Sequence, residues 1–259
     1  MIPTDATPAV SARSLLAKIQ VRSEYSSGYN RDYFKHWVDA NQNGCNTRYE
    51  VLIAEASIKP RISNGCYLSG GKWISKYDGV VFMSPKQMDI DHTVPLAEAW
   101  ASGAYKWSAS TREAFANDLG YSRSLIGVSA SSNRSKSDKD PYLWMPPKGA
   151  FACQYVDDWI AVKYRWGLSV DSTERADLLR KIINCGKRAY LATPPKAAVR
   201  FSSSGNSNSN PVPPRNSGQD PRFETCRFAK ASGYGPYYRG QDSEYSWYRD
   251  GDSDGIACE

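Results

Sequence analysis

Two carboxylates and a histidine stand close together in the run "MDIDHTVPLAEAW", residues 88–100. His92 is one of only two histidines in the chain, and its neutral imidazole can accept a proton from water near pH 7. Asp89 and Asp91 offer hard oxygen atoms of the kind that Mg²⁺ prefers. These residue types suit hydrolysis that is assisted by a divalent cation.

The run has the apolar character of a β-strand, in which alternate side chains face opposite sides. The two aspartates would then point outward from the core, and His92 would lie on the face opposite Asp91. Both side chains can reach one phosphate only if the strand ends or bulges there. Pro95 follows shortly after and indicates an ending.

Further polar residues follow a second predicted strand, "SLIGV" at 124–128. In the next run, "SASSNRSKSDKDP", Ser131 or Ser132 can cap a short helix. Asn133 and Lys136 are three positions apart and therefore share one face of that helix. The predicted order is strand, insertion, strand and helix.

This order resembles the HNH, or ββα-metal, nucleases, whose motif elements appear here as "DIDHTVP", "FANDL" and "SSNRSKSD". More specifically, the chain resembles a subgroup of secreted bacterial HNH-family proteins through "DIDHTVPLAEAWASGA", "FANDL", "NRSKSDKDP" and "WMPP". The resemblance covers most of residues 30–190 and implies an α+β fold, with a mostly helical body around a ββα-metal core. His92 and Asn133 are 41 positions apart, which is longer than in compact members, and the insertion is expected to be helical.

The resemblance implies a role for each matching residue. His92 is the expected general base, Asp91 and Asn133 are the expected metal ligands, and Asn117 of "FANDL" is expected to fix the loop that holds His92. Without a third histidine the chain cannot form an all-histidine zinc site, so the expected cofactor is Mg²⁺ or Mn²⁺.

Four other residues near these motifs keep alternative interpretations. Asp89 is a second metal ligand, a residue that holds a ligand in place, or a solvated carboxylate. Arg134 and Lys136 contact substrate phosphate or form a solvated basic face. Arg48, in "NTRYE", is a phosphate-binding or a structural arginine.

Hydrophobic spacing predicts the elements around this core. We expect helices over residues 30–40, 46–56, 153–166 and 171–192, and a hairpin or irregular strands over 65–82. We interpret the two later helices as part of the core scaffold. Asp171 is the predicted N-cap of the last one.

Composition divides the chain into a body, a linker and a tail. Residues 202–219, "SSSGNSNSNPVPPRNSGQ", contain no aromatic and one aliphatic residue, which predicts a flexible linker. We therefore expect a nuclease domain at 1–201 and a small domain at 220–259. The net charge is +6, but the tail from Asp220 holds eight acidic and five basic residues, which leaves 28 basic and 19 acidic residues before it. A basic body fits a polyanionic partner.

The tail ends in "DGDSDGIACE", where aspartates alternate as in the first ligands of an EF-hand loop. With "CRFAK" and "GPYYRG" upstream, residues 224–259 resemble the extracellular calcium-binding excalibur module. The resemblance makes Asp250, Asp252, Asp254 and Glu259 the expected Ca²⁺ ligands. A solvated acidic terminus is the alternative.

Six cysteines lie far apart and form no C-x-x-C pair, so disulfides and an oxidising compartment are expected rather than zinc. Six cysteines permit 15 pairings, so connectivity stays open. Proximity in sequence favours Cys45–Cys66, Cys153–Cys185 and Cys226–Cys258. No run approaches the roughly 20 apolar residues of a membrane span, and "MIPTDATPAVSARSL" lacks a signal-peptide layout, so we expect a soluble, secreted, mature chain.

We expect a secreted, monomeric, metal-dependent endonuclease that hydrolyses DNA, and RNA as a second substrate, without sequence specificity. The alternative is a noncatalytic, calcium-dependent cell-surface or matrix-binding protein with a degenerate nuclease body. In either case, the tail is expected to associate with a cell wall or surface. The sequence does not distinguish DNA from RNA or single from double strands.

Overall fold

The computed structural model describes residues 9–186, 191–202, 226, 237–240, 243–248 and 256–258. The chain divides into two compact units, Met1–Ser203 and Ser204–Glu259. The predicted linker, 202–219, lies outside the described residues except for its first residue. No described helix is long and apolar enough to cross a bilayer.

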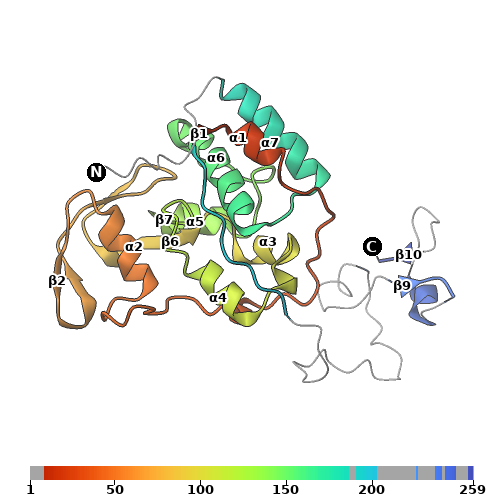
Figure 1. Ribbon diagram of the computed structural model, residues 1–259, viewed down its shortest axis with the longest axis horizontal. Coiled ribbons are helices and arrows are strands. Elements are labelled where there is room, and N and C mark those ends of the chain that lie inside the picture. Colours follow the sequence, from red (N-terminus) through yellow and green to blue (C-terminus); the bar gives the residue numbers. More distant parts are fainter. Residues whose placement is uncertain are drawn as a thin grey trace, which may run out of the picture. The chain divides into compact units, whose positions relative to one another are not determined.

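The first unit is a mixed α+β structure (Figure 1). Its helices are α1 (Ala12–Leu16), α2 (Thr47–Glu55), α3 (Leu96–Ala101), α4 (Ala109–Ala116), α5 (Ala130–Lys136), α6 (Gly149–Trp166) and α7 (Ser172–Asn184). Its strands are β1 (Ala9–Val10), β2 (Arg61–Ser63), β3 (Tyr67–Ser69), β4 (Trp73–Ile74), β5 (Val81–Phe82), β6 (Met88–His92), β7 (Leu125–Ser129) and β8 (Leu191–Ala192). They form antiparallel pairs only: β1 with β8, β2 with β3, β4 with β5, and β6 with β7.

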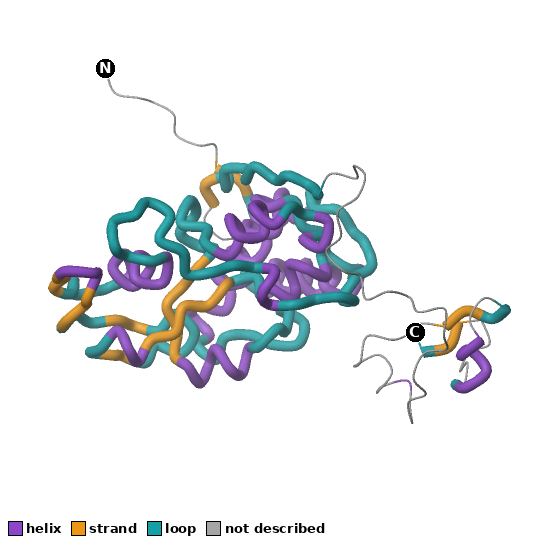
Figure 2. The backbone as a smooth tube through the Cα atoms, turned by 90° about the horizontal axis from the view of Figure 1, so that it is seen from below, coloured by secondary structure: helices purple, strands orange, loops and turns teal. Residues whose placement is uncertain are grey.

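The β6–β7 pair lies between two helices, because Met88 and Ile90 pack against α2 and the alternate residues Asp89 and Asp91 contact α5. Helices flank the strands of the first unit in Figure 2. The register sets Asp91 opposite Ile126 and Asp89 opposite Val128, so these four side chains share the α5 face. Both faces are therefore covered, and the expectation that Asp91 points outward is wrong, since only 8% of it is exposed.

Two hydrophobic cores meet at this strand pair. The larger core gathers side chains of α1, α3, α4, α6 and α7, and Ile126 and Val128 of β7 belong to it. The smaller core contains Val51 and Leu52 of α2, together with Met88 and Ile90 of β6. The strand pair is thus fixed by packing on both sides, which gives it a single register.

Most of the predicted elements are present. Helices α2, α6 and α7 and the helical insertion, α3 and α4, are confirmed, as are irregular short strands in the 65–82 region. The three disulfides pair as proximity in sequence favoured: Cys45–Cys66, Cys153–Cys185 and Cys226–Cys258. Helix α5 is capped by Ser129 rather than by Ser131 or Ser132, and α7 ends at Asn184, before Gly186.

The predicted helix over 30–40 is wrong, because only Arg31–Tyr33 forms a 3-10 turn. The side chain of Asn117 accepts a hydrogen bond from the Val38 N–H and donates one to the Lys35 carbonyl. These tertiary bonds take backbone groups that a helix would pair within itself. Trp37, with φ of 60°, has a left-handed conformation that no helix contains.

A buried lysine joins three helices of the larger core. The Lys163 ammonium of α6 lies 2.6 Å from Glu98 Oε1 of α3 and 2.7 Å from Glu174 Oε2 of α7. Trp159 donates to the other oxygen of Glu174 at 2.6 Å. Burial opposes the charge on Lys163, but the two carboxylates outweigh this effect and raise its pKa above the ordinary value. Burial raises the pKa of both carboxyls, Glu98 and Glu174, to about 7, with added repulsion from Glu24 on Glu98 and from Glu98 on Glu174.

The second unit is described at four short stretches. Strand β9 (Tyr237–Tyr238) pairs with β10 (Ile256–Ala257), and a 3-10 helix spans Ser243–Trp247. Cys226 is bonded to Cys258, the residue after β10. The calcium ligands predicted from the sequence, Asp250, Asp252, Asp254 and Glu259, lie outside the described residues.

The pair of glutamates around Lys163 should make stability depend on pH. A folded-state pKa near 7, above the ordinary 4.5, means that the folded protein holds a proton that the unfolded chain releases, so stability falls as pH rises from 4.5 through 7. Glu98→Gln keeps an acceptor for Lys163 without the second charge. We expect this substitution to raise the melting temperature at pH 8, by roughly 2 to 4 °C for each kcal/mol added to the free energy of unfolding. The melting temperature should also change less with pH than that of the wild type.

The control is Glu113→Gln, because the Glu113 carboxylate is partly exposed and makes only a 3.9 Å pair with Lys35. Melting curves from pH 5 to 8 provide the comparison. If the melting temperature of Glu98→Gln changes with pH as that of the wild type does, the two carboxyls ionise in the ordinary range.

Candidate active site

A cleft of about 240 Å³ opens at the C-terminal end of β6. Its lining residues come from β6, the start of α3, α5 and the segment before α2: Arg31, Ile90, Asp91, His92, Pro95, Leu96, Asn133, Arg134, Ser137 and Asp138. The strand ends at His92, as Pro95 predicted, and Pro95 precedes the first residue of α3. The structure therefore brings His92, Asp91, Asn133 and Arg134 to one cavity.

His92 is held on three sides. Its Nε2 lies 2.9 Å from the carbonyl oxygen of Ala116, which can only accept, so Nε2 carries the proton and donates. Its ring stacks between Trp37, at a centroid distance of 5.8 Å, and Phe115, at 6.4 Å. Burial lowers the pKa of His92 to about 3, so the imidazole is neutral at pH 7. Nδ1 has no hydrogen-bond partner within the described chain, which leaves it free to accept a proton.

Asn117 lies beside this arrangement without lining the cleft. Besides its bonds to Val38 and Lys35, its amide donates to the Glu113 carbonyl at 2.8 Å, at the end of α4. Asn117 directly follows Ala116, so its side chain ties the turn that carries Trp37 to the end of α4. The side chain is fully engaged with backbone groups, which fits a positioning role near His92.

Asp91 is bound through one oxygen. Its Oδ2 accepts a hydrogen bond from Tyr77 at 2.6 Å and pairs with the Lys136 ammonium at 2.7 Å. Lys136 also donates to the carbonyl of His92 at 2.9 Å. The other oxygen, Oδ1, makes no hydrogen bond within the described residues. Burial, next to the negative charge of Asp91, raises the pKa of Tyr77 well above its ordinary value, so Tyr77 stays a donor.

Asp89 contacts helix α5, which also carries Lys136. Its Oδ2 accepts a hydrogen bond from Asn133 Nδ2 at 3.0 Å, which turns the amide oxygen of Asn133 away from Asp89. Asp89 does not line the cleft. Of its three interpretations, the contact fits that of a residue holding another side chain in place.

Both interpretations of Lys136 are wrong, and Arg48 fits its structural interpretation. Lys136 is fully buried, and its ammonium is used by Asp91 and His92. Arg48 donates to the carbonyls of Pro85 and Met88 at 3.1 and 2.8 Å and so anchors the start of β6. Arg134 is exposed and lines the cleft, where it can meet a phosphate.

Sequence reasoning missed Arg31, Trp37, Tyr77 and Phe115. Arg31, Trp37 and Tyr77 lie outside the recognised motifs and reach the site through tertiary packing, whereas Phe115 is the first residue of "FANDL" but was given no role. For Arg31 and Trp37 the signal was hidden, because the hydrophobic spacing of residues 30–40 imitates a helix. No local pattern singles out Tyr77 in "SKYDG".

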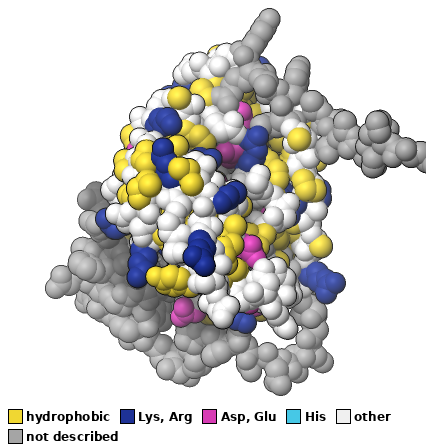
Figure 3. Space-filling view, turned by 90° about the vertical axis from the view of Figure 1, so that its left-hand side faces the viewer, with side chains coloured by type: hydrophobic (Ala, Val, Ile, Leu, Met, Phe, Trp, Pro, Cys, Tyr) yellow, Lys and Arg dark blue, Asp and Glu magenta, His cyan; other side chains and the backbone are white. Residues whose placement is uncertain are grey.

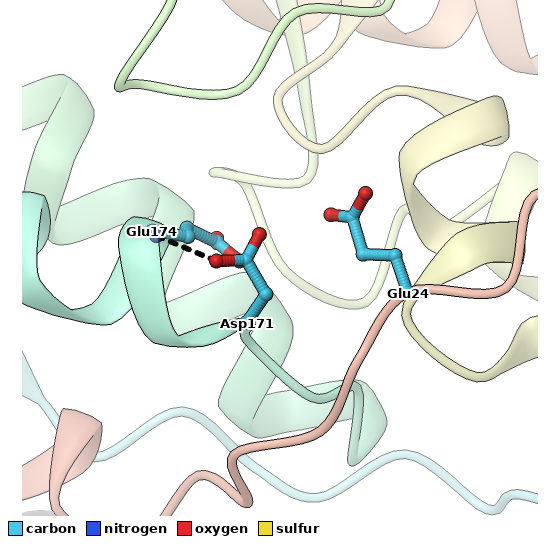
Figure 4. Close-up of side chains that lie close together, drawn as sticks. All are labelled: Glu24, Asp171 and Glu174. Atoms are coloured by element: carbon cyan, nitrogen blue, oxygen red, sulfur yellow. Dashed lines mark hydrogen bonds between the residues drawn. The ribbon is translucent and has the colours of Figure 1, made fainter. Parts of the chain in front are cut away.

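A second group of carboxylates, Glu24, Asp171 and Glu174, has oxygen atoms within 4.8 Å of one another (Figure 4). Asp171 caps α7 by accepting from the Thr173 and Glu174 N–H groups. Glu174 is held by Lys163 and Trp159. These roles are structural, and nothing further points to a ligand there.

The side chains at the cleft suit a hard divalent cation. Asp91 Oδ1 and the amide oxygen of Asn133 are free of protein hydrogen bonds within the described part, and both residues line the cavity. Oxygen donors of this kind, completed by water, bind Mg²⁺ or Mn²⁺.

Comparison with known proteins identifies both parts of the chain. Residues 45–181 match the family "GmrSD restriction endonucleases, C-terminal domain", and residues 223–259 match the "Excalibur calcium-binding domain". An "uncharacterized secreted protein" of Arthroderma benhamiae is 39% identical over 184 residues, which cover 71% of this chain and 89% of that protein. No solved structure matches.

The chain belongs to the family of the GmrSD restriction endonuclease C-terminal domain and carries an Excalibur domain at residues 223–259. The resemblance to an endonuclease family with an excalibur module is thereby confirmed. Arg31 and Trp37 lie before Cys45, the first matched residue of the endonuclease family.

Loss of the Lys136 ammonium should destabilise the fold rather than weaken substrate binding alone. Lys136→Met leaves Asp91 buried without its counterion, and such a loss costs about 3 to 5 kcal/mol. At roughly 2 to 4 °C per kcal/mol, the melting temperature should fall by about 10 °C. Lys139→Met, which removes an exposed ammonium three residues away, should melt close to the wild type. A Lys136→Met protein that melts like the wild type would contradict the structural role.

Proposed function

We propose that this protein is a secreted, metal-dependent endonuclease that hydrolyses phosphodiester bonds of DNA, and also of RNA, through a ββα-metal site formed by β6, β7 and α5. The observation that carries the proposal is the cleft itself, where His92 with a free Nδ1, Asp91 with a free oxygen and Asn133 meet. Membership of an endonuclease family supports it.

His92 acts as the general base in this proposal. The hydrogen bond to Ala116 fixes the tautomer, the two stacked rings hold the imidazole in place, and His92 lines the cleft. Nδ1 takes a proton from water while the water oxygen bonds to phosphorus and the bond to the 3′ oxygen breaks. The negative phosphate beside the ring favours the imidazolium that forms, offsetting the low pKa of the free protein.

Asp91 and Asn133 would hold the Mg²⁺ or Mn²⁺ ion, with waters completing its coordination. When bound, such an ion supplies positive charge to the phosphate and the leaving oxygen. Tyr77 and Lys136 fix one oxygen of Asp91 and leave the other for this purpose. Asp89 orients the amide of Asn133.

The surface supports a polyanionic substrate. Lys and Arg side chains are spread over the face of the first unit seen in Figure 3, among hydrophobic side chains. The chain before Asp220 has 28 basic and 19 acidic residues. Contacts of this type to phosphates are independent of sequence, which agrees with nonspecific cutting.

The alternative function is a noncatalytic, calcium-dependent protein that binds a cell surface or matrix. The Excalibur match at residues 223–259 is the observation that favours it. A degenerate body would be free to lose its reactive groups. The intact set of His92, Asp91 and Asn133 around one cleft therefore favours the endonuclease.

Secretion is supported by the three disulfides, which form and persist in oxidising compartments. The related protein of Arthroderma benhamiae is described as secreted. In this setting the substrate would be extracellular nucleic acid.

Purified protein should convert supercoiled plasmid to nicked and linear forms in Mg²⁺ or Mn²⁺. EDTA should stop the reaction, and His92→Ala should slow it by a factor on the order of 10² to 10⁴, the usual contribution of a general base. Agarose gels with plasmid and with total RNA measure both substrates. An inert wild type in every divalent metal, or full activity of His92→Ala, would contradict the proposed mechanism.

Removal of residues 204–259 should abolish calcium binding and leave cutting largely unchanged, because every residue of the cleft lies in the first unit. Isothermal titration with Ca²⁺ and the plasmid assay measure the two properties. In the full chain, Asp252→Ala with Asp254→Ala should reproduce the loss of calcium binding. Loss of cutting in the shortened chain would show that the tail contributes to the site.

A further inference from the structure

One residue of the cleft lining comes from a part of the chain that precedes β6. Among the described residues of the lining, Arg31 alone lies before Ile90, and the matched endonuclease family begins only at Cys45. Arg134 comes from α5 and lines the same cavity. Two arginines from separate segments thus border the space that Asp91, His92 and Asn133 share.

The backbone around Arg31 is anchored, although the side chain is exposed. Asn30 Oδ1 accepts from the Asp32 N–H at 2.9 Å, which closes the turn. On the other side of Arg31, the Tyr33 carbonyl accepts from Arg112 at 3.2 Å, and the Tyr33 ring stacks on Trp100 at 5.5 Å. Phe34 is fully buried. These contacts hold residue 31 at the mouth of the cleft.

The charge of Arg31 is not neutralised by an ion pair within the described residues. No carboxylate lies within 4.0 Å of the Arg31 or Arg134 guanidinium in the described part of the chain. Arg31 and His92 line the same cleft, so the positive charge of Arg31 belongs to the cavity that holds the proposed base.

We propose that Arg31 is a catalytic residue whose guanidinium contacts the scissile phosphate from the wall that α5 does not supply. The inference rests on the proposed function, because it assumes phosphodiester hydrolysis at His92. Negative charge on the phosphate oxygens is met best by a planar, always-charged donor pair. Preorganised donors of this kind act mainly on the transition state and so on the rate.

Asp138 is the competing partner, because its carboxylate also borders the cleft. If Arg31 served only to balance Asp138, removal of that carboxylate would have the same effect as removal of the guanidinium. Asp138→Asn, which keeps the shape of the side chain, separates the two roles.

The test compares Arg31→Ala, Arg31→Lys and Asp138→Asn with Arg13→Ala, in which an exposed arginine of α1 outside the cleft is removed. Full-length proteins in Mg²⁺ cut a labelled DNA duplex under single-turnover conditions at saturating protein. Fluorescence anisotropy in EDTA measures duplex binding without cutting. Melting temperatures of all variants should match the wild type, because these side chains are exposed.

We expect Arg31→Ala to lower the saturated rate by about 10², and Arg31→Lys to recover part of that loss. The dissociation constant in EDTA should rise much less than the rate falls, and Arg13→Ala should leave both quantities unchanged. Asp138→Asn should leave the rate at or above that of the wild type.

Three results would overturn the inference while the wild type cuts: a normal rate for Arg31→Ala, a loss of affinity with a normal saturated rate, or a loss in Asp138→Asn equal to that in Arg31→Ala. A wild type that does not cut would instead contradict the proposed function, and this inference with it.

Discussion

The fully buried ammonium of Lys136 sets the geometry on which the candidate site depends. An unpaired charge in the interior costs several kcal/mol, so α5 packs on β6 only where Lys136 meets Asp91 and the carbonyl of His92. The same docking puts Asn133 against Asp89 and leaves Arg134 at the edge of the cleft. Tyr77 donates a hydrogen bond to the same carboxylate oxygen of Asp91 that Lys136 contacts. One oxygen of the carboxylate is thereby used for structure, and the other is left for chemistry.

His92 depends on a second set of constraints that comes from outside the strand pair. The carbonyl of Ala116 fixes its protonated nitrogen, and Trp37 and Phe115 confine its ring. Asn117 links both supports, because it holds the turn around Trp37 and the end of α4. The N-terminal segment, which precedes the residues matched by the endonuclease family, therefore belongs to the candidate site as much as β6 does.

Short-range periodicity and turn residues were enough to predict β6, β7 and α5, and the resemblance to the HNH nucleases implied the meeting of Asp91, His92 and Asn133. The same reasoning failed for Lys136 and left two interpretations of Arg48 open, since a sequence does not show whether a basic side chain faces solvent or a partner 40 or more positions away. It also failed for residues 30–40, where hydrogen bonds from Asn117 override an apparent helical pattern. The calcium ligands of the tail stay a prediction.

The central claim is that one cleft binds both the phosphate and the catalytic cation. A crystal structure of His92→Ala with Mg²⁺ and a short DNA duplex tests it most directly, because the variant should hold substrate without cutting it. The account predicts a phosphate group in the cleft between Arg31 and Arg134, with the cation on Asp91 and Asn133. DNA bound on another face, or a cation at Glu24 and Asp171 with the cleft empty, would contradict it.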